Sequence, residues 1–150
     1  TGVLTRDAEA KIYEVHPAID TNLAAVLGLP PGASLHFVLN NAVYEDNRIP
    51  PRGFTNARFD QDGLRPVGAT YQDGQYWDTT DFIVPTATER LVVTLYYQTA
   101  SSEYLEFLRR NGGLDGEALH QLASETPNTP QVVQIAIFPD FRYYFPLIFR

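Results

Sequence analysis

Alternation of polar and apolar residues is the first signal along the chain. Residues 11–15 alternate with a period of two and are followed by Pro17, a pattern that predicts a half-buried strand stopped by the proline. Residues 34–39 alternate in the same way and predict a second strand. Residues 23–29, which lie between them, have helical potential that ends at Gly28.

The later part of the chain carries the strongest strand signals. Residues 90–97 and 131–138 are rich in β-branched and aromatic side chains. Residues 81–84 lead through a short turn into the first of these runs, which is the spacing of a hairpin or meander, and residues 42–44 predict a further short strand. Residues 58–74 hold several Gly, Pro and Asp residues and are expected to be mostly loop. Together these segments predict a mainly β fold, an antiparallel β-sandwich of the immunoglobulin-like type.

A helical hairpin is expected as an insert near residues 101–125. Ser101 is placed to cap a first helix, and an apolar stripe follows at helical spacing. The glycine pair at 112–113 predicts the end of that helix, and Asp115 is placed to cap a second one. The stripe consists of Tyr104, Leu105 and Leu108.

Length and composition limit the classes of protein that the chain can represent. Its 150 residues are the length of one ordinary domain, so residues 1–150 are expected to form a single β-sandwich with an apolar, aromatic tail at 139–150. The 18 acidic and 11 basic side chains give a net charge of −7, which argues against nucleic acid as the main partner. Every apolar run is much shorter than the ~20 residues of a membrane helix. The absence of cysteine excludes disulfides and covalent haem attachment through a Cys-x-x-Cys-His motif.

Residues able to carry catalysis are few. His16, His36 and His120 share no metal-ligand spacing. Ser34 lacks the Gly-x-Ser-x-Gly surroundings of a hydrolase nucleophile. We therefore expect no catalytic residue, no enzyme activity and no cofactor belonging to this chain.

A fragment of a calcium loop is present in the predicted loop region. Asp60-Gln61-Asp62-Gly63 has the opening spacing of an EF-hand, but Tyr71 stands at the twelfth loop position, where glutamate is needed. This departure excludes an EF-hand. A looser calcium cage of oxygen ligands from Asp60, Asp62 and Asp73 stays open beside the simpler interpretation, a plain Asp-Gly turn.

Two groups of aromatic residues raise the question of binding. Tyr71, Tyr76 and Trp77 could stack on sugar rings as a carbohydrate-binding module, although aromatic residues in a β-sandwich belong more often to the core. The apolar tail must either close the chain's own core or pack against a partner. Its candidate partner-binding residues are Phe141, Tyr143, Tyr144, Phe145 and Phe149.

The most specific string in the sequence spans residues 46–54. Two successive prolines impose an extended segment without amide donors, and Gly53 allows a positive-φ turn that swings Phe54 inward. The two arginines supply fork-shaped donors, and we expect Arg52 to pair with a carboxylate or with carbonyl groups. A rigid structural connection is favoured over a binding loop. The structural motif consists of Asp46, Asn47, Arg48, Pro50, Pro51, Arg52, Gly53 and Phe54.

This string resembles one in the C-terminal β-rich accessory domain of bacterial multihaem c-type cytochromes. The resemblance covers roughly residues 10–125 and includes residues 95–109, Leu-Tyr-Tyr-Gln-Thr-Ala-Ser-Ser-Glu-Tyr-Leu-Glu-Phe-Leu-Arg. In those cytochromes the haem-attaching motifs lie upstream of this domain, and the present chain has none. The resemblance therefore implies the accessory domain without its electron carrier, with haem expected only in a partner chain.

The function expected from this resemblance is structural. The chain would be a non-catalytic subunit or domain that packs against a multihaem cytochrome or another respiratory or photosynthetic electron-transfer complex of the envelope. The alternatives are a subunit of another extracellular or envelope assembly and a carbohydrate-binding β-sandwich. Thr1 in place of an initiator methionine and the aromatic, cysteine-free composition favour a processed protein in the periplasm or outside the cell.

Overall fold

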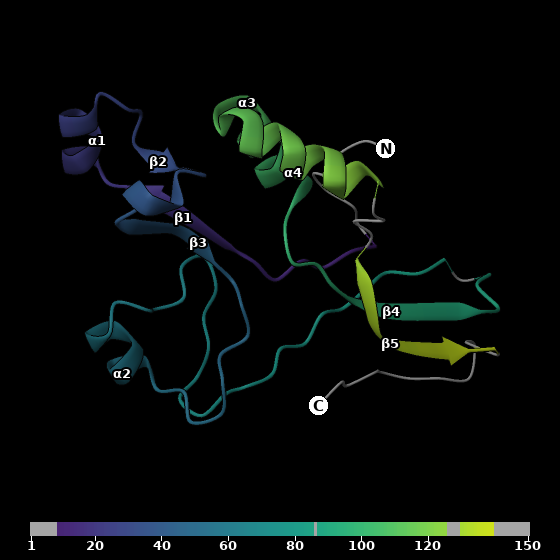
Figure 1. The fold of residues 1–150 in the computed structure, drawn as a ribbon. Coiled ribbons are helices and arrows are strands. Elements are labelled where there is room, and N and C mark those ends of the chain that lie inside the picture. The colour runs from purple at the N-terminus through teal and green to yellow at the C-terminus, as the bar shows by residue number, and fades with distance from the viewer. Residues whose placement is uncertain (1–8, 86, 126–129, 140–150) are drawn as a thin grey trace. The chain divides into compact units, whose positions relative to one another are not determined.

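The computed structural model describes residues 9–85, 87–125 and 130–139 (Figure 1). The chain divides into two compact units. We call the described residues 9–81 the N-terminal unit and the described residues from Phe82 onward the C-terminal unit. The expectation of one domain over residues 1–150 stays a prediction.

The N-terminal unit is built on a small antiparallel sheet. Strand β1 (Val15–Ile19) lies between β2 (Gly32–Ala33) and β3 (Ala42–Asp46). The pairing of β1 with β3 shifts register between His16 and Pro17. A proline without an amide donor fits at this irregularity, because the ladder there does not need its N–H.

The strand at the beginning of the chain was placed too early by the sequence pattern. The expected strand covers residues 11–15, whereas β1 runs from Val15 through Pro17 to Ile19. The side chain of Asn47 occupies the hydrogen-bonding groups of the earlier segment: its amide donates to Ile12 O at 3.0 Å, and its Oδ1 accepts from Glu14 N at 2.7 Å.

Three short helical elements complete the N-terminal unit. Helix α1 (Thr21–Leu27) begins after Asp20, whose carboxylate accepts a hydrogen bond from Leu23 N, and ends at Gly28 with a φ of 68°. The 3₁₀ helix η1 covers Phe37–Leu39, and α2 covers Asn56–Gln61. The helical potential of residues 23–29 is thus confirmed, and α2 interrupts a region expected to be mostly loop.

The strand expected at residues 34–39 is wrong. Local polar contacts compete with the strand: Ser34 Oγ accepts a hydrogen bond from His36 N, and the Asn40 amide donates to Ser34 O. These bonds close a tight turn, in which η1 forms, so the alternating apolar residues do not line one face of a sheet.

The C-terminal unit contains a two-stranded ribbon and a helical hairpin. Strands β4 (Leu91–Tyr97) and β5 (Gln131–Phe138) pair antiparallel, from Leu91 opposite Phe138 to Tyr97 opposite Gln131. Helices α3 (Ser102–Asn111) and α4 (Gly113–Glu125) pack against each other between the two strands in sequence. Figure 1 shows both pairs.

The helical hairpin agrees with the sequence pattern. Ser101 caps α3, because its hydroxyl accepts a hydrogen bond from Tyr104 N at 3.1 Å. Helix α4 begins at Gly113, so Asp115 lies in its first turn and is not its cap. Residues 81–84 form no strand, and β4 pairs with β5 in place of the hairpin expected between 81–84 and 90–97.

The expected fold class, a mainly β sandwich, is therefore contradicted. Among the described residues the sheets have only three and two strands, and more residues lie in helices than in strands. The reason is physical. The alternating runs at residues 11–15 and 34–39 became mostly turns or irregular segments, and β4 and β5 pair only with each other within the described residues.

The described core is small and lies in the N-terminal unit. Its buried apolar side chains are Ala18, Ile19, Ala24, Phe54 and Tyr71. No described hydrophobic side chain of the C-terminal unit reaches the same degree of burial. No helix within the described ranges is both long and apolar enough to cross a bilayer.

Candidate functional site

The proline-rich motif begins with an ion pair between a buried carboxylate and an exposed arginine. Asp46 ends β3 and is 8% exposed. Arg48 grips its carboxylate with both arms of the guanidinium, Nε to Oδ1 at 2.8 Å and Nη2 to Oδ2 at 2.7 Å. Burial alone would raise the pKa of Asp46, but the hydrogen bonds from the side chain and backbone of Arg48 outweigh it and hold the pKa below its ordinary value.

Asn47 connects the motif to the start of the chain and to a second loop. Besides its side-chain bonds to Ile12 and Glu14, its backbone N–H donates to Glu14 O at 3.2 Å. Its own carbonyl accepts a hydrogen bond from the hydroxyl of Tyr71 at 2.8 Å. One residue therefore joins three segments of the N-terminal unit.

The turn at residues 51–54 delivers one aromatic ring into the core. Phe54 N donates to Pro51 O at 3.1 Å, and Gly53 adopts a φ of 83°, which side-chain-bearing residues rarely take. Phe54 is fully buried, with its ring edge-to-face against Phe59 at a centroid distance of 4.7 Å. These are the contacts of a structural turn.

A second loop, residues 71–78, is fastened to this turn. Gly74 N donates to Phe54 O at 2.7 Å. Asn56 donates from its side chain to Tyr71 O and to the carboxylate of Asp73. These hydrogen bonds fix the position of the loop at residues 71–78 against the turn at residues 51–54. They therefore fix where the exposed side chains of both segments lie.

The two segments bring together three exposed side chains, Arg52, Tyr76 and Trp77, which we call the Arg52 shelf. The Arg52 guanidinium lies over the Tyr76 ring at 4.9 Å from its centroid. Tyr76 and Trp77 meet edge-to-face at 5.2 Å with an interplanar angle of 89°. The prediction that Arg52 pairs with a carboxylate or carbonyl group is thus wrong within the described chain, where Arg52 lies over the Tyr76 ring instead.

The three aromatic residues considered for sugar binding do not form a flat row. Tyr71 is 4% exposed and belongs to the core. Tyr76 and Trp77 are 43% and 44% exposed, but their rings stand nearly perpendicular and one carries Arg52. A sugar platform needs coplanar open faces, and this geometry does not provide them.

Two tyrosines of the N-terminal unit have altered acidity. Burial, followed by the nearby Asp78 charge and then by Tyr13 and Asp46, raises the pKa of Tyr71 to about 12. Burial also raises the pKa of Tyr13, whose hydroxyl donates to Asp78 at 3.0 Å. Neither residue is poised as an acid or base near neutral pH.

The acidic residues considered for calcium have protein partners. Asp60 pairs with Arg65 at 3.3 Å, and Asp62 pairs with Arg58 at 2.7 Å. Asp73 accepts hydrogen bonds from Asn56, which hold its pKa below the ordinary value. The described part of the chain contains no group of His, Asp and Glu residues arranged to hold a metal ion, so these three carboxylates are not brought together.

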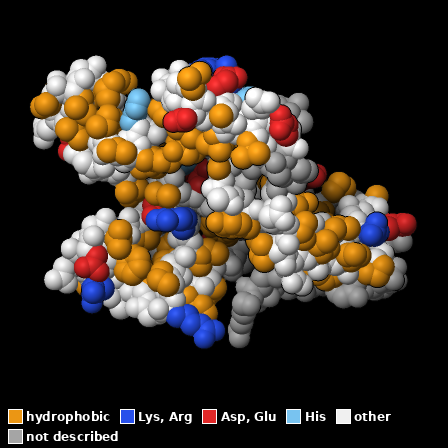
Figure 2. Space-filling view, viewed as in Figure 1, with side chains coloured by type: hydrophobic (Ala, Val, Ile, Leu, Met, Phe, Trp, Pro, Cys, Tyr) orange, Lys and Arg blue, Asp and Glu red, His pale blue; other side chains and the backbone are white. Residues whose placement is uncertain are grey.

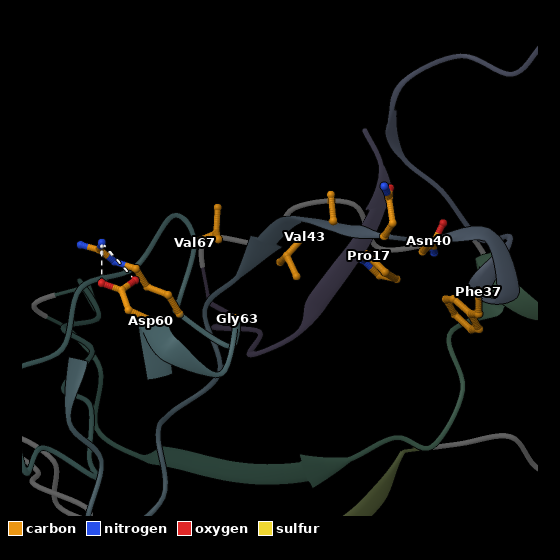
Figure 3. A pocket seen from close by; sticks show the side chains of 10 residues that line it. Pro17, Phe37, Asn40, Val43, Asp60, Gly63 and Val67 are labelled. Carbon is orange, nitrogen blue, oxygen red and sulfur yellow. Dashed lines mark hydrogen bonds and ion pairs between the residues drawn. The ribbon is translucent and has the colours of Figure 1, made fainter. Parts of the chain in front are cut away.

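A shallow hollow lies beside β3. It has a volume of about 580 Å³ and is lined by residues that include Pro17, Asn40, Val43 and Asp60. Figure 3 shows its labelled side chains on several separate segments, and the titratable residues that line it, Asp60 and Arg65, pair with each other. His16, which precedes the lining residue Pro17, pairs with Glu14 at 3.1 Å. The hollow has no recognisable catalytic arrangement.

The β4–β5 ribbon exposes a group of apolar side chains in the C-terminal unit. Neighbouring residues on a regular strand face opposite sides, yet Leu95 and Tyr96 of β4 are both 56% exposed, so neither face is covered. The ribbon contains no charged residue. Figure 2 shows hydrophobic side chains gathered over it, and those most exposed are Val92, Leu95, Tyr96, Tyr97, Val132, Val133, Ile135 and Ile137.

The tail residues expected to bind a partner, Phe141, Tyr143, Tyr144, Phe145 and Phe149, lie outside the described residues, and their role stays a prediction. Both strands of the ribbon were predicted from the sequence, at residues 90–97 and 131–138, but as strands of a sandwich. The contact of Arg52 with Tyr76 had no sequence signal, because the two residues are 24 positions apart along the chain and only the folded loops bring them together.

Compared with known proteins, the chain matches no protein-family model, no curated protein and no solved structure.

Proposed function

We propose that this chain is a non-catalytic structural subunit or domain that packs against a protein partner through its β4–β5 ribbon. The observation that carries the proposal is the exposure of apolar side chains on both faces of that ribbon. A two-stranded ribbon has little stability alone in water and needs a third strand or a covering layer. An apolar surface of this kind marks an interaction site when it is found on a folded protein.

A partner that carries haem, a c-type cytochrome or a neighbouring subunit of an envelope electron-transfer complex, fits this role. The resemblance of residues 46–54 and 95–109 to the accessory domain of multihaem cytochromes supports that partner class. The N-terminal unit also fits an accessory role, because motif residues such as Arg48 and Asp46 form internal contacts and are not arranged for catalysis. On this proposal the protein acts in the periplasm or outside the cell and leaves electron transfer to the partner.

The composition of the native particle tests this proposal. The tagged full-length chain would be purified from its own cells at low detergent, sized by light scattering, and assayed for covalent haem per chain. We expect a particle larger than the chain, with haem in a second polypeptide or in a longer form of the same one. A particle of this chain alone, with no haem, would contradict the proposal.

A matched pair of variants connects the particle to the ribbon. Val133→Lys places a charge in the ribbon, where burial against a partner would desolvate it, and is expected to release the partner. Val26→Lys is the control, because Val26 is 82% exposed in the last turn of α1. If both variants retain the partner equally, the ribbon is not the docking surface.

A further inference from the structure

The Arg52 shelf presents a cation without a carboxylate partner. Among the described arginines, Arg48, Arg58, Arg65, Arg109 and Arg110 pair with acidic side chains, whereas Arg52 and Arg90 do not. Arg52 is exposed and, unlike Arg90, lies over an aromatic ring, that of Tyr76. In a chain with an excess of acidic residues, a guanidinium left unpaired beside two open aromatic rings is conspicuous.

The two fastened loops hold this guanidinium in place. The Gly74–Phe54 hydrogen bond and the bonds of Asn56 to the second loop fix the backbone on either side of the shelf. Contact with the Tyr76 ring restricts the Arg52 side chain but consumes none of its N–H donors. A restricted arginine loses less conformational entropy on binding than a free one.

We propose that the Arg52 shelf is a docking point for a carboxylate of a partner protein, an Asp or Glu side chain or a chain terminus. A carboxylate matches the fork of a guanidinium with two parallel hydrogen bonds. Tyr76 and Trp77 add open ring surface beside it, and Arg, Tyr and Trp are the residues in which interface binding energy concentrates.

A carboxylate on a protein fits this surface better than one on a sugar. A uronic acid would need an open ring face for its pyranose beside the guanidinium, but the face of Tyr76 at that point carries Arg52 and Trp77 stands perpendicular to it. This inference rests on the proposed function, since it supplies one chemical feature of the partner. It concerns a different surface, so the two can fail separately.

Titration of the full chain with a carboxylate probe tests the inference. The probe is the peptide acetyl-Glu-Glu-Glu-amide, and its matched control is the Gln-Gln-Gln peptide. The readouts are the Nε–H resonance of Arg52 and the indole N–H resonance of Trp77, which is unique because the chain has one tryptophan. We expect saturable shifts of both with the Glu peptide, no shifts with the Gln peptide, and weaker binding as salt rises.

Variants assign the effect to the shelf. Arg52→Gln is expected to weaken binding about tenfold or more, because a bidentate charged contact is lost. Arg52→Lys keeps the charge without the fork and should bind with intermediate affinity. Arg58→Gln removes an exposed arginine that is already paired with Asp62 and should leave binding unchanged. Unaltered backbone resonances around Phe54 establish that each variant is folded.

Three results would overturn the inference. One is the absence of saturable shifts at Arg52. Another is an equal loss of binding in Arg52→Gln and Arg58→Gln. The third is tighter binding of an oligogalacturonate than of the Glu peptide, which would make the shelf a sugar site. Val133→Lys, which tests the ribbon, is expected to leave this titration unchanged.

Discussion

The hydroxyl of Tyr71 donates a hydrogen bond to the backbone carbonyl of Asn47, with 2.8 Å between the two oxygens. The two residues are 24 positions apart in sequence, and the bond joins the proline-rich motif to the loop that carries Tyr76. Tyr71 is 4% exposed, so water has little access to the Asn47 carbonyl as a substitute donor if the hydroxyl is removed. The position of the Arg52 shelf therefore depends on a contact between two residues outside it.

Removal of this hydroxyl is expected to destabilise the N-terminal unit. Tyr71→Phe leaves a carbonyl without its partner in a largely buried place, at a cost of about 1–3 kcal/mol in the free energy of unfolding. Urea unfolding followed by circular dichroism measures the change. Tyr44→Phe is the control, because Tyr44 is 61% exposed and should change stability by less than about 0.5 kcal/mol. Equal effects of both variants would refute a special role for the bond.

Stability is expected to fall at alkaline pH. The pKa of Tyr71 is raised from 10.0 to about 12 in the folded protein, so the fold favours the protonated ring. The corresponding stabilisation is complete below pH 10, the ordinary value, and is lost as the pH rises from there through about 12. Tyr13 shifts in the same direction. Urea midpoints between neutral pH and this range should decline, and Tyr71→Phe should flatten the decline.

Asn47 should control the order of the segment before β1. Asn47→Ala removes the acceptor of Glu14 N–H and the donor to Ile12 O. Amide hydrogen exchange at Glu14 should accelerate by tenfold or more, because a lost hydrogen bond of about 1.4 kcal/mol corresponds to that factor. Exchange within β4 is the internal reference and should not change. Unchanged exchange at Glu14 would show that Asn47 does not hold this segment.

Gly116 should be required for the packing of α3 against α4. A Cβ atom at this position would lie 2.0 Å from the carbonyl oxygen of Leu108, so the helices would have to separate. Gly116→Ala is expected to cost about 1–3 kcal/mol, despite the higher helix propensity of alanine. Ala118→Ser, at an exposed position of α4, is the control. Thermal unfolding of both variants tests the contact, and a stabilised Gly116→Ala protein would contradict it.

Local signals in the sequence predicted the elements whose causes are local. The α3 cap at Ser101 and the end of α1 at Gly28 follow from side-chain and backbone preferences within a few residues. The runs that became β4 and β5 were also recognised, because β-branched and aromatic residues favour strands in many contexts.

Elements that depend on distant partners were not predictable. The start of β1 depends on where the Asn47 side chain binds, and periodicity contains no information about that contact. A sandwich was expected because strong strands normally cover one another, whereas β4 and β5 remain apart from the sheet of β1, β2 and β3 in their hydrogen bonding. For the same reason the motif residues could be named from the sequence, but the ring partner of Arg52 could not.

The absence of charge along β4 and β5 has a consequence for the kinetics of assembly. A neutral apolar surface exerts no long-range attraction, so docking through the ribbon would proceed at the unsteered rate of about 10⁵–10⁶ M⁻¹s⁻¹ and would change little with ionic strength. Contact at Arg52 would instead weaken as salt is added. Ionic strength thus separates the two surfaces: added salt would weaken the contact at Arg52 but have little effect on the contact made by the ribbon.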